Sequence, residues 1–118
     1  MKKYTICLID DKSYGIPQLI NAIPQDIEYV FYYYNRITDI EDIDFDIVIL
    51  DYYLDKDNKT ALEIIDRFLG SIIIGFSSED SCNQKMLQNG AFYSAKKLSN
   101  TNLNLELQEI FKDFLFLS

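Results

Sequence analysis

Acidic and hydroxyl side chains follow three of the short apolar runs in this sequence, at the point where each run ends. Asp10 and Asp11 follow the first run, Asp51 follows the third, and Ser77 follows the fourth. Carboxylates gathered in one place repel one another and raise each other's pKa, so such a cluster needs a cation. Mg²⁺ is a hard ion that prefers carboxylate and water oxygens. The residue types therefore predict a magnesium-binding pocket. The alternative is that each carboxylate simply ends its own strand as a turn former.

The elements that must position these residues alternate along the chain. Short β-rich runs are separated by stretches with helical periodicity, which is typical of parallel strands joined by crossover helices. The runs cover residues 4–9, 27–34, 46–50, 72–76 and, more weakly, 91–95. Continuous apolar character at 47–50 and 72–74 predicts central strands that are covered on both faces.

Apolar residues at helical spacing predict five helices between and after these runs. They cover residues 16–23, 37–43, 61–69, 78–89 and 103–115, and the second is the weakest. Gly70 is expected to end the third helix and Ser78 to cap the fourth. This alternation indicates an α/β fold with a flavodoxin-like, doubly wound five-stranded parallel sheet of order 2-1-3-4-5 and helices on both faces. In such sheets ligands bind outside the carboxyl ends of the strands, where the aspartates and Ser77 stand.

Four segments, taken in order, resemble the receiver domain of response regulators, the chemotaxis-regulator-like phosphoacceptors of two-component signalling. They run from Leu8 to Asp11, Asp46 to Asp51, Gly75 to Ser78 and Gly90 to Lys97, and the similarity spans the whole chain. The resemblance implies that Asp51 is the phosphoacceptor and that Asp10 and Asp11 hold Mg²⁺ with it. It also implies that the backbone carbonyl of Tyr53 completes the metal shell and that Ser77 hydrogen-bonds a phosphoryl oxygen.

The family also places a lysine at the end of the fifth strand, and two adjacent lysines compete for that position. A match without gaps from Gly90 selects Lys97 and leaves Ser94 where the family has an aromatic switch residue. Deleting one loop residue instead selects Lys96 and places Tyr93 at the switch position. We prefer Lys96 and Tyr93, with Lys97 as the alternative, because loops absorb deletions more readily than strands change their inward-facing residues.

The sequence departs from the family pattern near the phosphoacceptor. The segment 52–60 is longer than the common form of this loop and lacks its glycine, and no proline follows the lysine. Tyr53 and Glu79 stand two residues after Asp51 and Ser77, at the positions that in the family tune how water reaches the acyl phosphate. We therefore expect an altered dephosphorylation rate, in either direction.

Length, charge and composition exclude several classes of protein. A chain of 118 residues has room for one receiver domain, 1–118, and for no effector domain. A formal charge of −8 without a basic patch argues against nucleic-acid binding. There is no histidine, which removes histidine-based catalysis and metal binding. No apolar stretch is long enough for a signal peptide or membrane span, so we expect a cytoplasmic protein without membrane contacts, in which Cys7 and Cys82 are free thiols.

Together these observations predict a stand-alone response regulator. Asp51 would accept a phosphoryl group from a histidine kinase or phosphotransfer protein with Mg²⁺ as cofactor, and the labile acyl phosphate would change a protein-binding surface. The chain would catalyse its own phosphorylation and dephosphorylation rather than turn over a conventional substrate. It would act on an unidentified output protein, as a monomer or weak homodimer.

Two other classes compete with this interpretation. One is a receiver-like interaction module that does not turn over phosphoryl groups. The other is a phosphatase with an aspartyl nucleophile, which would need a general acid at the position of Tyr53. Nucleotide binding is disfavoured because no phosphate-binding glycine loop follows the first strand.

Overall fold

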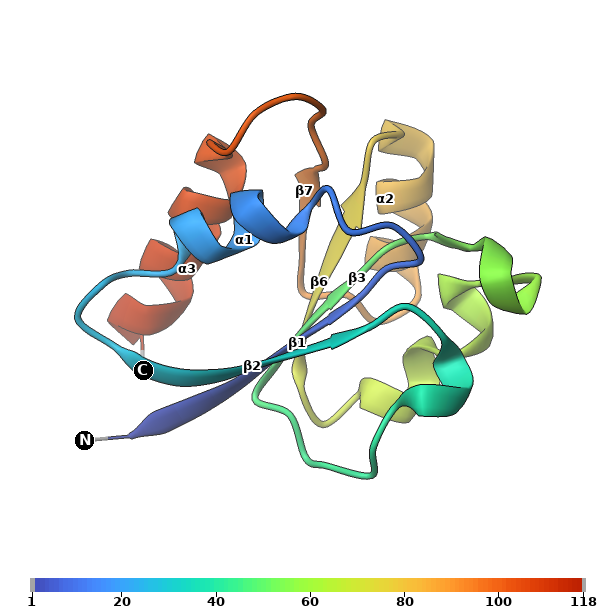
Figure 1. Cartoon of the computed structure of the whole chain (residues 1–118), viewed down its shortest axis with the longest axis horizontal. Coiled ribbons are helices and arrows are strands. Elements are labelled where there is room, and N and C mark those ends of the chain that lie inside the picture. The colour runs from blue at the N-terminus through green and yellow to red at the C-terminus, as the bar shows by residue number, and fades with distance from the viewer. Residues whose placement is uncertain (1, 118) are drawn as a thin grey trace.

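The computed structural model describes residues 2–117, and the side chains of residues 2–115. Its central element is a five-stranded sheet in which all neighbouring strands are parallel (Figure 1). The strands are β1 (Lys3–Ile9), β2 (Glu28–Tyr34), β3 (Ile47–Leu50), β6 (Ile72–Ser77) and β7 (Tyr93–Lys96), in the spatial order β2-β1-β3-β6-β7. Counted along the chain, this is the predicted flavodoxin-like order 2-1-3-4-5, which is confirmed.

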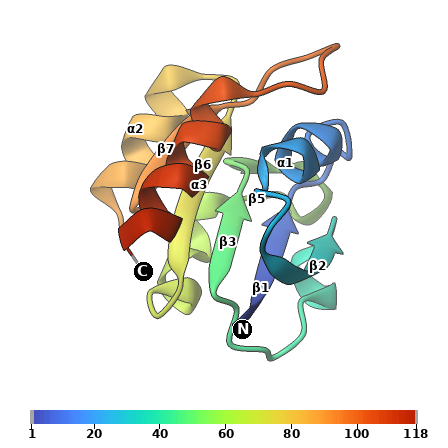
Figure 2. The same cartoon turned by 90° about the vertical axis from the view of Figure 1, so that its left-hand side faces the viewer.

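The aliphatic runs form the centre of the sheet. All four side chains of β3 are fully buried, and so is the second half of β1. Branched aliphatic side chains pack well on a pleated surface, and burial on both faces explains why these strands show no alternation of polar and apolar residues. The less completely buried strands β2 and β7 lie at the two edges of the sheet (Figure 2).

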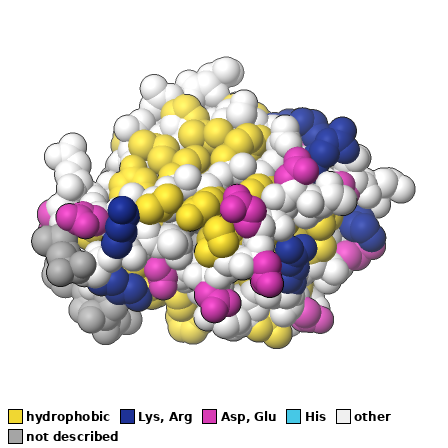
Figure 3. All heavy atoms as spheres, turned by 60° about the horizontal axis from the view of Figure 1, so that its bottom comes forward, with side chains coloured by type: hydrophobic (Ala, Val, Ile, Leu, Met, Phe, Trp, Pro, Cys, Tyr) yellow, Lys and Arg dark blue, Asp and Glu magenta, His cyan; other side chains and the backbone are white. Residues whose placement is uncertain are grey.

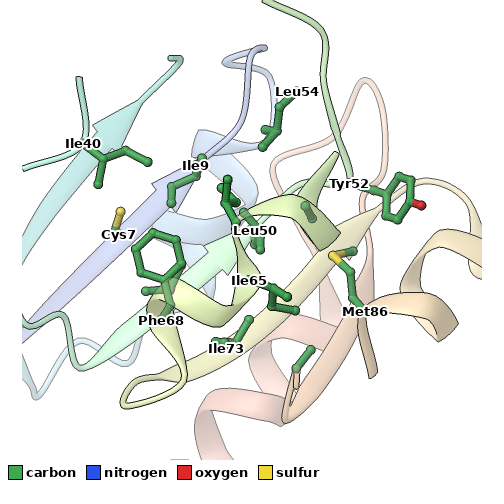
Figure 4. Packing of buried hydrophobic residues seen from close by; sticks show 14 of the residues in the cluster. Cys7, Ile9, Ile40, Leu50, Tyr52, Leu54, Ile65, Phe68, Ile73 and Met86 are labelled. Carbon is green, nitrogen blue, oxygen red and sulfur yellow. The ribbon is translucent and has the colours of Figure 1, made fainter. Parts of the chain in front are cut away.

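Helices cover both faces of the sheet, as predicted. On one face α1 (Ile16–Ala22) lies against α3 (Leu105–Leu117), and Leu19 and Phe111 pack in the core between these helices and the sheet (Figure 1). The other face is covered by α2 (Asp80–Gln88) and by short 3₁₀ helices. Within the core on that side, Met86, Ile65 and Phe68 pack toward the strands (Figure 4).

The segment 61–69 is not the single α-helix that its apolar stripe predicts. It forms two 3₁₀ helices, η3 (Ala61–Glu63) and η4 (Ile65–Phe68), which are separated at Ile64, a residue with φ −124°. Its buried apolar side chains still face the core. Turns of three and of 3.6 residues place a short apolar stripe on nearly the same face, so the stripe identifies the buried side of this segment but not its helix type.

Two other predicted helices are shorter than expected. The segment 37–43 contains only a single 3₁₀ turn, η1 (Ile37–Asp39). Helix α2 begins at Asp80, with Glu79 rather than Ser78 at the capping position. The N–H of Glu79 instead donates to the hydroxyl oxygen of Ser77 at 3.1 Å, so the segment before α2 is organised by the serine at the end of β6.

The long loop after Asp51 is ordered as a small hairpin. Strands β4 (Tyr53–Leu54) and β5 (Lys59–Thr60) pair antiparallel around a 3₁₀ turn, η2 (Asp55–Asp57). Asn58 closes the turn in the left-handed conformation, with φ 53°. Asparagine tolerates this conformation better than most residues, so the turn forms without glycine.

Both cysteines are buried free thiols, as predicted. Burial raises the pKa of Cys7 to about 12, so this thiol stays protonated. Across residues 2–117, no helix combines the length and the apolar character that crossing a bilayer requires.

Candidate functional site

Backbone hydrogen bonds continue the sheet one residue beyond its strands and place the polar side chains at its carboxyl edge. The amides of Asp10 and Asp51 donate to carbonyls of neighbouring strands at 3.1 and 2.9 Å. The amide of Lys97 likewise donates to the carbonyl of Ser77 at 3.0 Å. Because all these strands run in one direction, the four residues converge at the edge where doubly wound sheets bind ligands.

The structure brings the three predicted metal ligands together. Carboxylate oxygens of Asp10, Asp11 and Asp51 all lie within 4.8 Å of one another. Asp10 is fully buried and Asp51 is 7% exposed, whereas Asp11 is half-buried and faces the opening. Three carboxylates with this spacing offer only hard oxygen donors, which is the donor set that suits Mg²⁺.

The lysine of this pocket is Lys97, so our preference for Lys96 is wrong. The ammonium of Lys97 lies 2.8 Å from Oδ2 of Asp10 and 3.3 Å from Oδ1 of Asp51, and the residue is 5% exposed. Lys96 points outward, and its side chain is exposed. Side chains alternate between faces along an extended chain, so buried Ala95 places Lys96 outside and Lys97 inside. The loop therefore keeps its full length, and the match without gaps is the correct one.

The same correction removes the basis for Tyr93 as the switch residue. In the register without gaps, Ser94 stands three residues before the pocket lysine and pairs with Gly75 of β6. The phenol of Tyr93 donates to Oδ2 of Asp113 at 2.7 Å, so it bonds to helix α3 in this structure. The aromatic side chain of β7 is thereby tied to the last helix.

The charges of the pocket are only partly balanced. The Lys97 ammonium offsets one of three carboxylate charges, which leaves a net charge suited to a divalent cation. Burial and the charge of Asp10 raise the pKa of Asp51 to about 7, although Lys97 acts to lower it. Burial acts to lower the pKa of Lys97, but the hydrogen bond to Asp10 and the charges of Asp10 and Asp51 raise it. Lys97 is therefore a permanent cation, whereas the charge on Asp51 is costly in this buried position.

Asp10 is held rigidly from several sides. Its Oδ1 accepts the amide of Lys12 at 3.0 Å, while its Oδ2 accepts the ammonium of Lys97. The phenol of Tyr33 donates to its backbone carbonyl at 2.9 Å. Asp11, in contrast, is bonded through Oδ2 to the amide of Asp55 at 3.2 Å, which connects it to the hairpin loop.

Ser77 is positioned by a residue that sequence reasoning missed. Asn83 of α2 is buried, and its Oδ1 accepts the amide of Ser77 at 3.0 Å. Its Nδ2 donates to the carbonyls of Ser77 and Ala95 at 3.0 and 3.1 Å. Asn83 therefore ties the end of β6 to β7. The available signal was an asparagine inside a helix, where it is disfavoured unless its side chain has another partner.

Gln18 has a similar positioning role behind Lys97 and was also missed. It is fully buried, and its side-chain amide both donates to and accepts from the backbone of Leu98, at 2.6 and 3.1 Å. Its Oε1 also accepts Nδ2 of Asn104 at 2.9 Å. These bonds fix the chain directly after Lys97 against α1.

A small cavity of about 110 Å³ opens over these groups. The lining includes Asp11, Asp51, Tyr53, Ser77, Glu79 and Lys97. Tyr53 is 46% exposed, and Oε2 of Glu79 accepts the thiol of Cys82 at 3.1 Å. The two positions predicted to tune dephosphorylation thus border the same opening as Asp51.

Comparison with known proteins supports the predicted receiver-domain fold. No protein-family model and no curated protein sequence matches the chain. Among solved structures, the chain is similar to the BeF3-activated receiver domain of DrrB, with 19% identity, 98% of this chain and 99% of that chain covered, and a TM-score of 0.69. A CheY-like receiver domain protein from Methanospirillum hungatei is 16% identical over 98% of this chain and 96% of its own, with a TM-score of 0.69.

A third similar structure is NtrX from Brucella abortus, with a TM-score of 0.73 and 17% identity. It covers 98% of this chain, and the match spans 28% of the NtrX chain. The chain therefore has the fold of response-regulator receiver domains over nearly its full length.

Proposed function

We propose that the chain is a response-regulator receiver that accepts a phosphoryl group on Asp51 from a histidine kinase or phosphotransfer protein. The observation that carries the proposal is the placement of Asp51 at the bottom of an open cavity, 3.3 Å from the ammonium of Lys97 and beside two further carboxylates. This arrangement supplies a nucleophile, a fixed cation and a set of metal ligands at one point.

Asp10, Asp11 and Asp51 would hold Mg²⁺, together with the backbone carbonyl of Tyr53. The fit rests on three oxygen donors within 4.8 Å of one another and on a charge that Lys97 offsets only in part. When bound, Mg²⁺ neutralises charge on the phosphoryl oxygens during transfer. Bringing a divalent ion close to Asp51 also favours its ionised, nucleophilic form.

The residues of the chain then have separate tasks in the reaction. A carboxylate oxygen of Asp51 attacks phosphorus in line, an oxygen–phosphorus bond forms, and the bond between phosphorus and the donor breaks with its electron pair leaving on the donor. The ammonium of Lys97 pairs with one phosphoryl oxygen. The Ser77 hydroxyl oxygen accepts the Glu79 amide, and its hydrogen can rotate toward another phosphoryl oxygen.

Phosphorylation would be read out on the surface of β7 and α3. The new group adds nearly two negative charges next to Ser77 and Lys97. Ser77 is joined through Asn83 to β7, and Tyr93 of β7 is joined to Asp113 of α3. A shift at Ser77 therefore reaches a surface that an output protein can contact. The similar DrrB receiver domain is described in a BeF3-activated form. We expect beryllofluoride to mimic the phosphorylated state of this chain.

Phosphodonor labelling tests the proposal directly. The chain is incubated with Mg²⁺ and a small phosphodonor, and its intact mass is measured. We expect a gain of one phosphoryl group that needs Mg²⁺ and disappears in Asp51→Asn. Lys97→Ala should slow labelling strongly, while Lys96→Ala, its exposed neighbour, should label as the wild type does. If no phosphoryl group is gained, the alternative of a receiver-like interaction module is favoured instead.

Tyr53 and Glu79 border the cavity, so we also propose that they set the rate at which water removes the phosphoryl group. Tyr53→Asn and Glu79→Ala should each change the lifetime of the phosphorylated chain without abolishing labelling. Following the decay of the phosphorylated mass gives this lifetime, and an unchanged lifetime in both variants would show the assignment to be wrong.

A further inference from the structure

Strand β2 is an edge strand without the usual protection against pairing. Its seven residues, Glu28–Tyr34, include five aromatic side chains and a valine, and no charge, proline or glycine follows Glu28 within the strand. Edge strands usually carry lysine, proline, a bulge or an inward-pointing charge, which prevents other chains from pairing with them. Figure 2 shows β2 at the open edge of the sheet, and Figure 3 shows hydrophobic side chains gathered in a patch on this side of the molecule.

The backbone of β2 presents a row of hydrogen-bonding groups away from the sheet. The carbonyl of Tyr34 accepts the amide of Asp10, so the peptide groups of Tyr34 are directed toward β1. Peptide groups alternate in direction along a strand, which directs those of Tyr29, Phe31 and Tyr33 outward. Within residues 2–117, β2 pairs with β1 alone, and no group of the chain bonds to these outward amides and carbonyls.

The other edge of the sheet is different. At the end of β7, the amide of Lys96 donates to Oε2 of Glu106 at 2.8 Å, and its carbonyl accepts Nδ2 of Asn104 at 2.9 Å. The side chains of Glu106 in α3 and of Asn104, just before it, therefore bond the outward groups of Lys96. Within residues 2–117 the outward groups at the end of β7 are thus bonded inside the chain, whereas those of β2 are not.

We propose that β2 pairs with β2 of a second copy of this chain, antiparallel and about a twofold axis at Phe31, which joins the two sheets. The outward peptide groups of Tyr29, Phe31 and Tyr33 then face those of Tyr33, Phe31 and Tyr29 in the second copy, so each set meets its complement. A twofold contact of this kind uses each β2 edge once and closes at a dimer.

Charges at the two ends of β2 favour this occupant and this direction. Asp26 stands five residues before Phe31 and Arg36 five residues after it, and both are exposed. Asp26 lies in the turn just before β2 and Arg36 in the bend just after it, so the two flank opposite ends of the strand. The Arg36 guanidinium also donates to the carbonyl of Lys56 at 3.3 Å, at an exposed position. In the antiparallel dimer the Asp26 end of one copy lies beside the Arg36 end of the other, which brings opposite charges near each other at both ends of the contact. A parallel, in-register arrangement would instead place like charges together.

Sedimentation velocity of the full chain over a wide concentration range tests the dimer. We expect concentration-dependent dimers, with a dissociation constant raised by roughly tenfold in Asp26→Lys or in Arg36→Glu, because each change places two like-charged pairs in the interface. The double variant restores opposite charges and should return to the wild-type constant. Asp51→Asn should leave dimerisation unchanged, which separates this inference from the proposed phosphoryl chemistry.

Cross-linking tests the register. Facing residues of this type have Cα atoms about 5.5 Å apart, within the range of a disulfide. Phe31→Cys should therefore form a covalent dimer under mild oxidation, while Phe92→Cys, at an exposed position away from β2, should not. The native cysteines are buried and do not interfere. A chain that stays monomeric throughout, charge variants that all dimerise equally, or equal cross-linking at positions 31 and 92 would each overturn the proposal.

Discussion

Replacing Lys97 with methionine removes the ammonium group that the structure places against the buried carboxylates of Asp10 and Asp51. Methionine keeps most of the length and volume of the lysine stem, so the change is mainly electrostatic. The ammonium lies 2.8 and 3.3 Å from the two carboxylates, and the side chains of all three residues are at most 10% exposed. Solvent screening is therefore weak, and the pair is unlike an exposed ion pair.

The expected loss follows from leaving buried charge without a partner. Removing one partner of a buried ion pair costs about 3–5 kcal/mol. Part of this cost can be relieved by protonation of Asp51, whose pKa is already raised from 3.8 to about 7. Without Lys97, which acts to lower that pKa, protonation becomes easier still. We expect Lys97→Met to lose about 3 kcal/mol of unfolding free energy at pH 8 without metal, and clearly less at pH 6.

Urea unfolding in EDTA measures this loss. With a denaturant dependence of about 2 kcal/mol per molar urea, 3 kcal/mol lowers the unfolding midpoint by about 1.5 M. Lys96→Met is the matched control, because the same substitution at an exposed neighbour should change the midpoint little. Adding Asp51→Asn to Lys97→Met should recover most of the loss. Equal losses in the two lysine variants, or a loss for Lys97→Met that is the same at pH 6 and pH 8, would refute the reasoning.

Three further predictions concern stability. In EDTA, the raised pKa of Asp51 favours the folded state at low pH, and this contribution to stability is lost as the pH rises through about 7. Asp51→Asn should therefore have a higher melting temperature than the wild type at pH 8 and lose that advantage near pH 5. It should also gain less stability from Mg²⁺. Asn83→Ala breaks three buried hydrogen bonds and should cost about 2 kcal/mol in urea unfolding, whereas Gln84→Ala on the exposed side of the helix should cost little. Burial acts to raise the pKa of Asp46, but hydrogen bonds from Thr5 and the charge of Lys2 lower it overall. Asp46→Asn should therefore be less stable than the wild type near pH 7, and this difference in stability should disappear as the pH falls below about 4.

Several features could be predicted from the sequence because they depend on residue type over a whole element. Uninterrupted aliphatic runs indicate strands buried on both faces, and β3 is one. Once the strand order is known, carboxylates after the first and third strands must meet at one edge, as Asp10, Asp11 and Asp51 do. These predictions succeed because topology, rather than detailed packing, decides them.

Other features depend on differences that residue types do not show. A short apolar stripe fits an α-helix and a 3₁₀ helix almost equally. After the hairpin that ends at Thr60, the chain forms the 3₁₀ helices η3 and η4. Asn83 and Gln18 position the site through hydrogen bonds to segments far away in the chain or on another element, which no local pattern reveals.

The pocket itself shows the same division. The sequence alone determined that a parallel sheet would gather Asp10, Asp11, Asp51 and Ser77 at one edge, since each follows its own strand. Only the tertiary structure decided between Lys96 and Lys97, because two adjacent lysines are chemically identical. The alternation of side chains around buried Ala95 turns Lys97 inward to Asp10 and leaves Lys96 in solvent.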